Sequence, residues 1–432
     1  MKYDVVVVGT RVAGAAIALL LARQGVRVLA VDRAHQGSDT LSTHQIQLPG
    51  GARLKQWGLL DRVVATGCPP ASSVRFDSGF GVLSGDYPSH GGVGAVYSPR
   101  RTLLDVVLQE AAAEAGADVR DGFVVDGLRT GRDGRVTGIR GSSRGSSRGA
   151  ASRGSSSRGA VGGSSGGGAS VGVTEEIEAD LVIGADGKHS TVAQAVGAAT
   201  YLDRGATAAA CYTYFAGLPV SGGEVYLRPD RMVGLWPTND GLTIVFLSVP
   251  AARFAAMRSD LDAAYRHLVG EVADLGPRLA AATQAERLRA TPDLPNRFRQ
   301  PYGPGWALVG DAGVVMDPCT GLGIGHALHD AELFGDAVLS GDFAQAHRVR
   351  DAYRKPVFDM TTQLAAYRPD RTGAVVFPAL AEDPRLVTEF LGVLTGITPP
   401  DRFFRPGRLR RIVGWRGLGR LALARHAAPT RA

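Results

Sequence analysis

The stretch of residues 2–33 constrains the fold of this chain most, because it has the order strand, glycine turn, helix, strand. Apart from Asp4, residues 3–8 are apolar and end in four β-branched valines, typical of a strand buried on both faces, and residues 14–24 are rich in Ala and Leu, as in a buried helix. Residues 26–31 predict a second buried strand that ends at Asp32. This βαβ spacing predicts a nucleotide site, with helix N–H groups at a pyrophosphate and Asp32 at a ribose hydroxyl.

One residue departs from the glycine pattern G-x-G-x-x-G, because Arg11 stands where the second glycine is expected. Gly9 and Gly14 are in place, so we expect the tight turn and the close contact between helix and strand to survive. Arg11 stands at the position where glycine would let the backbone approach a phosphate closely, so it is this approach that the substitution affects. We hypothesise that its side chain points along the pyrophosphate or away from it, which would leave the turn intact.

The length of 432 residues suggests two to three domains, and 44% hydrophobic residues with a mean hydropathy near zero are those of an ordinary globular protein. No apolar run reaches the roughly 18–20 residues of a membrane helix. A strand that begins within three residues of the start leaves no room for a signal peptide. The three cysteines are scattered without C-x-x-C spacing, so we expect neither a disulfide framework nor a zinc site, and a cytoplasmic protein.

The net charge of +7 does not indicate a nucleic-acid partner, because the excess lies in two segments. Residues 140–173 carry five arginines and residues 402–432 carry nine, both without acidic residues, and without these fourteen the net charge becomes −7. Residues 141–170 form a Gly/Ser/Arg repeat with nothing to bury, which predicts disorder, and we favour an expanded hairpin tip over an RNA-binding segment. Residues 408–426 could lie on a membrane or a carrier protein, but their three glycines weaken a helix, and we favour docking on the body.

The middle of the chain predicts a change from an α/β to an antiparallel β architecture. A helix begins at Arg101, a β-hairpin covers residues 123–139, and a buried strand precedes the Gly-Ala-Asp-Gly segment of residues 184–187. Residues 205–250 then alternate as several antiparallel strands, and residues 251–285 are helical in pattern. The sheet carries four aromatic residues that suit a flat or greasy substrate, although half or more of them are expected to be core: Tyr212, Tyr214, Trp236 and Phe246.

A second ligand signal lies near residue 310. A buried strand over residues 306–309 ends in Gly310-Asp311, which places a carboxylate at the carboxyl end of a strand, where open α/β sheets bind ligands. Gly321-Leu322-Gly323 then leads into a helix over residues 324–339. These glycines would let a flat ring approach the backbone, and the helix N–H groups favour negative charge there. A buried helix with a glycine-rich cap is the alternative.

In their order and spacing, GTRVAG at 9–14, Arg101-x-x-Leu104, GADG at 184–187 and GDAGVVMDPCTGLGIGHALHDA at 310–331 resemble one family. The chain is similar to the FAD-dependent monooxygenases of the para-hydroxybenzoate hydroxylase type and to the related geranylgeranyl-reductase-like oxidoreductases. Gly313 stands where the family usually has the histidine of GDAAH. The resemblance implies an α/β fold with a Rossmann-like FAD-binding domain, an antiparallel β-sheet substrate domain and a helical C-terminal region. The expected ranges are 1–75, 96–200 and 276–340 for FAD, 76–95 and 201–275 for substrate, and 341–432 for the helical region.

The resemblance also implies residue roles. It places the pyrophosphate at residues 9–14, the adenosine ribose at Asp32, the pyrophosphate or ribityl region at Arg101, FAD and nicotinamide at Asp186, and the ribityl chain at Asp311. The complete implied FAD set is Gly9, Arg11, Val12, Ala13, Gly14, Asp32, Arg33, His44, Arg101, Val125, Asp186, Gly187, Asp311, Pro318, Gly321, Leu322 and Gly323. An exposed helix arginine is the alternative for Arg101, and a simple turn residue is the alternative for Asp186.

The histidines give no firm catalytic candidate. His44 follows the second strand, where the family places residues near the flavin, and it is a weak candidate for flavin or substrate contact beside a structural role. His326 and His329 are three residues apart on the helix after the glycines, but no carboxylate or thiol completes a metal set, so we expect no metal site.

The implied reaction is a monooxygenation in which NADPH or NADH reduces FAD and O₂ forms a flavin C4a-hydroperoxide. One oxygen would enter a small hydrophobic or aromatic metabolite by hydroxylation or epoxidation, as in secondary metabolism. The alternative is a reductase or dehydrogenase of the geranylgeranyl-reductase type, which acts without oxygen insertion. A halogenase is disfavoured because the W-x-W-x-I-P segment and its lysine are missing, and the intact motifs disfavour a flavin sensor. The sequence indicates no oligomeric state.

Overall fold

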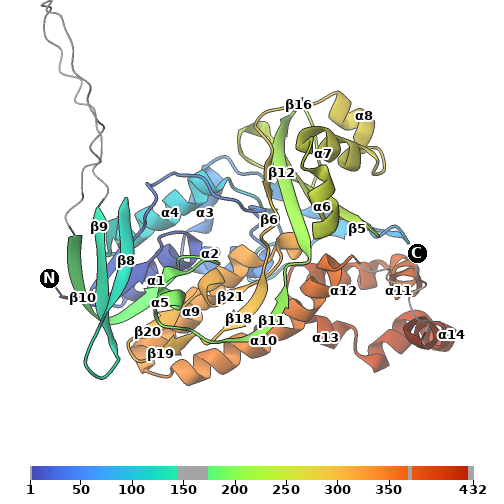
Figure 1. The fold of residues 1–432 in the computed structure, drawn as a ribbon. Coiled ribbons are helices and arrows are strands. Elements are labelled where there is room, and N and C mark those ends of the chain that lie inside the picture. Colours follow the sequence, from blue (N-terminus) through green and yellow to red (C-terminus); the bar gives the residue numbers. More distant parts are fainter. Residues whose placement is uncertain (1, 144–173, 368–371, 427–432) are drawn as a thin grey trace, which may run out of the picture.

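The computed structural model describes residues 2–143, 174–367 and 372–426 (Figure 1). Two large β-sheets, each with helices packed on it, lie side by side, and a group of helices extends from them at the carboxyl end of the chain. The predicted fold class is therefore confirmed: a Rossmann-like α/β unit, an antiparallel sheet and a helical C-terminal region.

The first sheet has a parallel centre with β1 in its middle, between β10 and β2. Val5, Val6 and Val7 of β1 are almost fully buried, because helices or the hairpin cover both faces, and this explains the unbroken apolar run. The strand order is β19-β20-β10-β1-β2-β7, and β8 and β9 extend the sheet beyond β10. Its strands are β1 (Lys2–Val8), β2 (Val28–Val31), β7 (Asp118–Arg120), β8 (Phe123–Thr130), β9 (Val136–Ser143), β10 (Thr174–Gly184), β19 (Tyr302–Gly303) and β20 (Trp306–Leu308).

Helix α1 (Val12–Arg23) is the central helix of this unit and packs between α4 (Arg101–Glu114) and α9 (Gly323–Ser340). All but two of its 12 residues are buried, and most of them are Ala or Gly, so neighbouring helices can approach closely. Helices α2 (Leu48–Gln56) and α3 (Leu60–Ala65) continue this layer, and α5 (Thr191–Ala195) follows β10. The packing brings the N-termini of α1 and α9, which are some 310 residues apart in sequence, to the same sheet edge.

The second sheet is antiparallel except where β13 pairs with β4, and its two faces differ. Helices α6 (Ala251–Met257), α7 (Leu261–Gly270) and α8 (Leu275–Ala280) cover one face, at the top of Figure 1. The other face carries the aromatic residues. Its strands are β4 (Ser73–Asp77), β5 (Val82–Asp86), β12 (Ala208–Ala216), β13 (Gly223–Arg228), β14 (Arg231–Pro237), β15 (Thr243–Pro250), β16 (Thr283–Gln284) and β17 (Arg289–Thr291).

Short elements join the two sheets. Strands β11 (Thr200–Gly205), β18 (Asn296–Arg299) and β21 (Val314–Val315) form a small sheet, and β3 (Pro70–Ala71) pairs with β6 (Val96–Tyr97). The short 3₁₀ turns are η1 (Asn239–Gly241), η2 (Gly310–Ala312) and η3 (Pro318–Thr320).

The carboxyl-terminal region is helical, as expected. Helix α10 (Phe343–Ala365) packs along α9, and α11 (Gly373–Ala381), α12 (Pro384–Leu394), α13 (Pro400–Phe403) and α14 (Pro406–His426) form the end of the molecule at the right of Figure 1. A cluster of phenylalanines that includes Phe390 and Phe403 holds α12 and α13 together. Helix α14 packs on α11 but breaks at Gly414, whose backbone is not helical.

Some local expectations differ from the structure. Residues 141–143 belong to β9 because they pair with β8 and, at 141–142, also with β10, and the remaining expected disorder, at 144–170, lies outside the described residues. The helical pattern of 251–285 ends at Ala280, because residues 283–284 pair with β12. Strands within 73–77 and 283–291 also join the antiparallel sheet, which is broader than residues 76–95 and 201–275. Among the described helices, none has the length and apolarity that a bilayer crossing requires.

Candidate functional site

The turn between β1 and α1 is tight and depends on its two glycines. Gly9 has a φ of +100°, and a Cβ there would lie 2.5 Å from the carbonyl oxygen of Ala185. A Cβ on Gly14 would lie 1.7 Å from the oxygen of Gly9. Glycine is therefore needed at both positions, once for the backbone conformation and once for close contact.

The N-terminus of α1 is open to a ligand. No side chain caps it, and the N–H groups of Val12, Ala13 and Gly14 have no partner within the helix because they belong to its first turn. The positive end of the helix dipole also lies here, so the turn favours an anion.

The Arg11 side chain is held by the protein. Its guanidinium lies 3.1 Å from the carboxylate of Asp105 and donates to the carbonyl oxygens of Ser38 and Asp39 at 3.4 and 3.2 Å. Arg101 binds the same Asp105 carboxylate through two nitrogens, at 2.8–3.0 Å. Both arginines are thus positioned by one buried carboxylate on α4 that the motif comparison did not identify.

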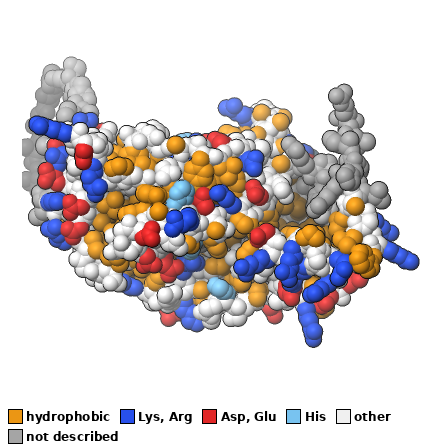
Figure 2. All heavy atoms as spheres, turned by 90° about the horizontal axis from the view of Figure 1, so that it is seen from below, with side chains coloured by type: hydrophobic (Ala, Val, Ile, Leu, Met, Phe, Trp, Pro, Cys, Tyr) orange, Lys and Arg blue, Asp and Glu red, His pale blue; other side chains and the backbone are white. Residues whose placement is uncertain are grey.

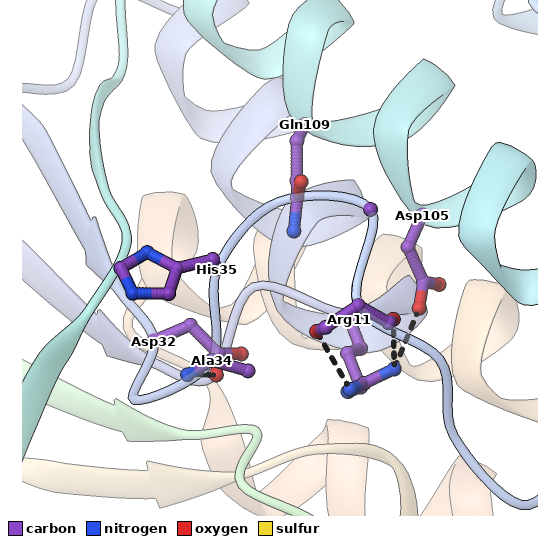
Figure 3. A pocket seen from close by; sticks show the side chains of 8 residues that line it. Arg11, Asp32, Ala34, His35, Asp105 and Gln109 are labelled. Carbon is purple, nitrogen blue, oxygen red and sulfur yellow. Dashed lines mark hydrogen bonds and ion pairs between the residues drawn. The ribbon is translucent and has the colours of Figure 1, made fainter. Parts of the chain in front are cut away.

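A small pocket lies beside this turn (Figure 3). Asp32 and His35 stand at one side of it and Arg11 and Asp105 at the other. Oδ2 of Asp32 accepts from the backbone N–H and the hydroxyl of Thr10 (2.8 and 3.4 Å), whereas Oδ1 accepts from the N–H of Ala34 (2.9 Å) and keeps a lone pair for a further donor. The lining residues are Arg11, Asp32, Ala34, His35, Gly37, Ser38, Asp105 and Gln109.

Two further residues of the expected set lie at this end of the sheet. Arg33 is exposed and makes no hydrogen bond or ion pair with the described part of the chain. Val125 lies on β8 opposite Gly141, directly before a register shift. This strand starts beside Asp32, because the N–H of Phe123 donates to the Asp32 carbonyl at 2.8 Å.

The Gly310-Asp311 turn adjoins α1, because a Cβ on Gly310 would lie 2.9 Å from the Cβ of Ala13. Gly310 N–H donates to Asp330 at 3.0 Å, and Asp330 forms an ion pair with Arg354 at 2.7 Å. Both charged side chains are at most 2% exposed. Asp311 itself is exposed to solvent, and desolvation by the surrounding protein raises the pKa of its carboxyl.

The N-terminus of α9 is the second open helix end. Leu322 provides no side-chain cap, and the space beside Gly323 is empty to 4 Å. Gly321, after Pro318, has a φ of +65°, and a Cβ there would lie 1.9 Å from the Oε1 of Gln45. Buried polar atoms that lack a hydrogen-bond partner in the described chain lie close by, Nε2 of Gln45 and Oε1 of Gln47. Such atoms normally find a partner, and here a ligand would supply it.

Asp186 has a structural role in addition to any role toward a ligand. Its Oδ2 accepts from the N–H groups of Thr191 (2.6 Å) and Val192 (3.2 Å) at the start of α5, while the buried Oδ1 has no partner among the described residues. Burial raises the pKa of this carboxyl. Gly187 follows with a φ of +79°, which only glycine adopts readily.

His44 and Tyr214 connect the two sheets. His44 is fully buried, has a φ of +66°, and its Nδ1 lies 2.7 Å from the carbonyl oxygen of Ser42. Because a carbonyl only accepts, Nδ1 carries the proton and Nε2 accepts from the Tyr214 hydroxyl at 2.7 Å. Burial lowers the pKa of His44 to about 4, so the ring is neutral near pH 7. Such a backbone conformation in a non-glycine residue is strained and often functional.

The four aromatic residues share one face of the antiparallel sheet. Tyr212 pairs with Phe246 across β12 and β15, and Trp236 and Tyr214 both lie opposite Ile244. All four are buried, and Cys319 of η3 packs against their cluster. The Tyr212 hydroxyl donates to the Thr40 carbonyl at 3.3 Å. The apolar face therefore meets the His44 loop and the turn before α9.

The two histidines of α9 pack against an aromatic ring and do not form a metal-binding cluster. His326 and His329 contact the Tyr353 ring, and burial lowers the pKa of both. No group of three or more potential metal ligands occurs in residues 2–143, 174–367 or 372–426.

Together the two open helix ends, the carboxylates of Asp32 and Asp311, and the orphaned atoms of Gln45, Gln47 and Asp186 fit a long anionic ligand with a flat polar ring. The sequence reasoning missed Asp105, Gln45, Gln47 and Asp330. Of these four residues only Asp330 had a signal in the sequence, because it lies within the glycine-rich segment of residues 310–331. The other three belong to no local pattern.

A family model described as "FAD binding domain" matches residues 2–152 and 167–341. Digeranylgeranylglycerophospholipid reductase 2 of Methanothermobacter thermautotrophicus is 28% identical over 78% of this chain and 77% of its own length. Squalene epoxidase erg1 of Schizosaccharomyces pombe is 24% identical over 76% of this chain and 68% of its own length. A flavoprotein/dehydrogenase structure from Cytophaga hutchinsonii superposes with a TM-score of 0.77 at 19% identity, covering 98% and 99% of the two chains, and shares the fold.

Proposed function

Since the chain belongs to the family that shares this FAD-binding domain and is a FAD-dependent oxidoreductase, we propose that it is an NAD(P)H-consuming monooxygenase. It inserts one oxygen atom of O₂ into a small hydrophobic or aromatic metabolite, by hydroxylation or epoxidation. The buried aromatic face beside the turn before α9 carries this proposal, because a substrate that binds against it next to the flavin site would have apolar, water-poor surroundings. The similarity to a squalene epoxidase adds support.

In this proposal FAD lies along the edge where α1 and α9 begin. The α1 end and its glycine turn hold the pyrophosphate, Asp32 accepts from the adenosine ribose beside Arg33 and Val125, and Asp311 accepts from the ribityl chain. Asp186 and Gly187 border the same edge. Arg11 and Arg101 contribute to binding from the positions in which the Asp105 carboxylate holds them. The flavin ring would be held by the His44 loop and by the turn before α9, through Pro318, Gly321, Leu322 and Gly323.

When bound, FAD would supply the redox chemistry between NAD(P)H and O₂. The N-terminus of α9 stabilises negative charge on the reduced ring through its uncapped N–H groups. Tyr212 and Tyr214 stay protonated because burial raises the pKa of both hydroxyls, to about 12 for Tyr212. The protons of both hydroxyls and of His44 are donated to groups of the protein, so the oxygens of Tyr212 and Tyr214 would accept from a polar group of the substrate and orient it.

A FAD-dependent reductase acting on C=C or C–C bonds is the second candidate. It is supported by the similarity to digeranylgeranylglycerophospholipid reductase 2 over most of both chains. The same site would serve it, because an apolar face beside the flavin suits an isoprenoid chain as well as a ring.

An isotope experiment separates the two candidates. The purified holoenzyme is given NADPH or NADH, candidate substrates and ¹⁸O₂, and the product is analysed by mass spectrometry. One ¹⁸O atom in the product supports the monooxygenase. An unlabelled product that also forms under strict anaerobiosis contradicts it and supports the reductase.

A pair of glycine variants tests where FAD lies. Gly323→Ala and Gly335→Ala both place a methyl group on α9 where no atom lies within 4 Å, and alanine favours a helix by about 1 kcal/mol. Both variants should fold at least as well as the parent. Only Gly323→Ala should weaken FAD binding, by tenfold or more, because its methyl group enters the space of the ring. An unchanged FAD dissociation constant for Gly323→Ala would contradict this placement.

A further inference from the structure

The last helix has one face on the protein and one face without a partner. Leu409 and Leu421 of α14 are each 6% exposed, and a Cβ on Gly417 would lie 3.7 Å from Val375 of α11, so this side is docked. The opposite side is exposed and carries Trp415, which is 75% exposed, the largest value among the exposed large hydrophobic residues.

The exposed face of α14 is also basic and uncompensated. Among the described residues, none forms a hydrogen bond or ion pair with the side chains of Arg410, Arg411, Arg416 or Arg420, and residues 402–426 contain no acid. Arg410 only packs its guanidinium over the Trp415 ring, at 5.0 Å. Figure 2 shows Lys and Arg side chains gathering at the end of the molecule formed by the C-terminal helices, with a few acidic groups among them.

A basic cavity precedes this face along the chain. It has a volume of about 360 Å³ and lies between α13 and the start of α14. Arg402 and Arg405 line it without a hydrogen-bond or ion-pair partner in the described chain, whereas Arg408 pairs with Glu389 and stacks over Phe403. Two free guanidinium groups in a hollow suit a phosphate group.

We propose that the exposed face of α13 and α14 docks on the surface of an anionic lipid bilayer. Trp415 inserts at the level of the headgroups, where tryptophan is favoured. The free arginines bind lipid phosphates, and one such phosphate lies within the cavity. A bilayer fits this face better than an acidic protein does. The single exposed indole of Trp415 matches the apolar layer just under the headgroups, and the arginines around it match the anionic headgroups themselves. The docking is peripheral.

Electrostatics should dominate this binding. Each arginine close to an anionic surface strengthens binding about fivefold, so removing four should weaken it by more than a hundredfold. The attraction falls within a Debye length and should largely vanish at high salt.

The test uses the full-length, FAD-loaded protein and sedimentation with vesicles of phosphatidylcholine alone or with one-quarter phosphatidylglycerol, at 50 and 500 mM NaCl. We expect binding only to the anionic vesicles and only at low salt. The other three tryptophans are at most 8% exposed, so Trp415 should cause a blue shift of the emission on binding. Trp415→Phe should remove that shift.

Matched variants separate this face from general basicity. Arg410→Gln/Arg411→Gln/Arg416→Gln/Arg420→Gln should lose vesicle binding and keep its FAD spectrum. Two controls should bind like the parent: Arg132→Gln/Arg258→Gln/Arg287→Gln/Arg348→Gln, which removes four exposed arginines elsewhere, and deletion of residues 144–170. Equal loss in either control, absence of binding to anionic vesicles at 50 mM NaCl, or binding to poly-glutamate as tight as to vesicles without a Trp415 shift would overturn the proposal.

Discussion

The guanidinium of Arg11 lies 3.1 Å from the carboxylate of Asp105, across 94 residues of sequence. Asp105 also holds Arg101, so one nearly buried carboxylate faces two guanidinium groups. Arg11 extends this link to the backbone of residues 38 and 39, which fixes the loop after β2 against α4. The residue that departs from the glycine pattern is thus part of the wall of the pocket beside Asp32.

This relationship predicts that Arg11→Ala affects stability more than cofactor affinity. The substitution removes the bonds to Asp105, Ser38 and Asp39, but the Asp105 charge keeps Arg101, so the free energy of unfolding should fall by about 1–2 kcal/mol. The dissociation constant for FAD should change less than threefold. Chemical denaturation and FAD titration measure the two effects. Arg258→Ala, at an exposed arginine after α6 and outside the candidate site, should change neither, and a tenfold loss of FAD affinity in Arg11→Ala without loss of stability would indicate a direct phosphate contact.

His44 predicts a loss of stability in acid. Its pKa is about 4 in the folded protein and about 6.5 when unfolded, so between these values the unfolded chain binds the extra proton. Stability from this group is therefore present above pH 6.5 and is lost as the pH falls toward 4, by about 3 kcal/mol in all. Asparagine tolerates the positive φ at this position but does not titrate, so urea unfolding of His44→Asn should show a weaker pH dependence over this window. His267→Gln, on the surface, should follow the parent, and a parallel course of His44→Asn and parent would refute the assignment.

The Tyr214 hydroxyl should be worth more to stability than the Tyr212 hydroxyl. Tyr214→Phe leaves the buried Nε2 of His44 without a donor, which costs about 1–3 kcal/mol. Tyr212→Phe removes only a 3.3 Å bond to a backbone carbonyl and should cost about 0.5–1.5 kcal/mol. Thermal or urea unfolding of the two variants gives the comparison. If they are equally stable, the hydrogen bond between Tyr214 and His44 does not form.

Local pattern was sufficient for the scaffold of this protein. Gly9, Gly14 and Asp32 lie within one βαβ unit, whose turn and spacing follow from chain geometry, and the alternation in β12 placed Tyr212 and Tyr214 on one face. The antiparallel sheet was also foreseen, but the expected ranges left out the first residues of β4, which begins at Ser73, and the strands β16 and β17 within 283–291. Strands of only two or three residues, such as β16 and β17, carry too little periodicity to be recognised.

The partners that complete the candidate site could not be read from the sequence. Asp105 and Gln109 are single polar residues on a helix, and nothing nearby in sequence shows that they face Arg11 and Thr10 after folding. Gln45 lies beside Gly321 only because α9 packs on α2. Such pairs depend on tertiary packing, which one sequence without local periodicity does not encode in a readable way.

The pair of Asp330 and Arg354 predicts strong non-additivity. Arg354→Met should cost about 3–5 kcal/mol, because it leaves the buried Asp330 charge with only the Gly310 N–H, and Asp330→Leu should cost a similar amount by stranding Arg354. The double variant removes both charges and should recover much of the loss. It should nevertheless bind FAD more weakly than the parent, since Gly310 N–H then lacks the acceptor that fixes the turn carrying Asp311. A double-mutant cycle by urea unfolding, with FAD titration of each variant, measures both effects, and additive losses would show that the two charges do not depend on each other.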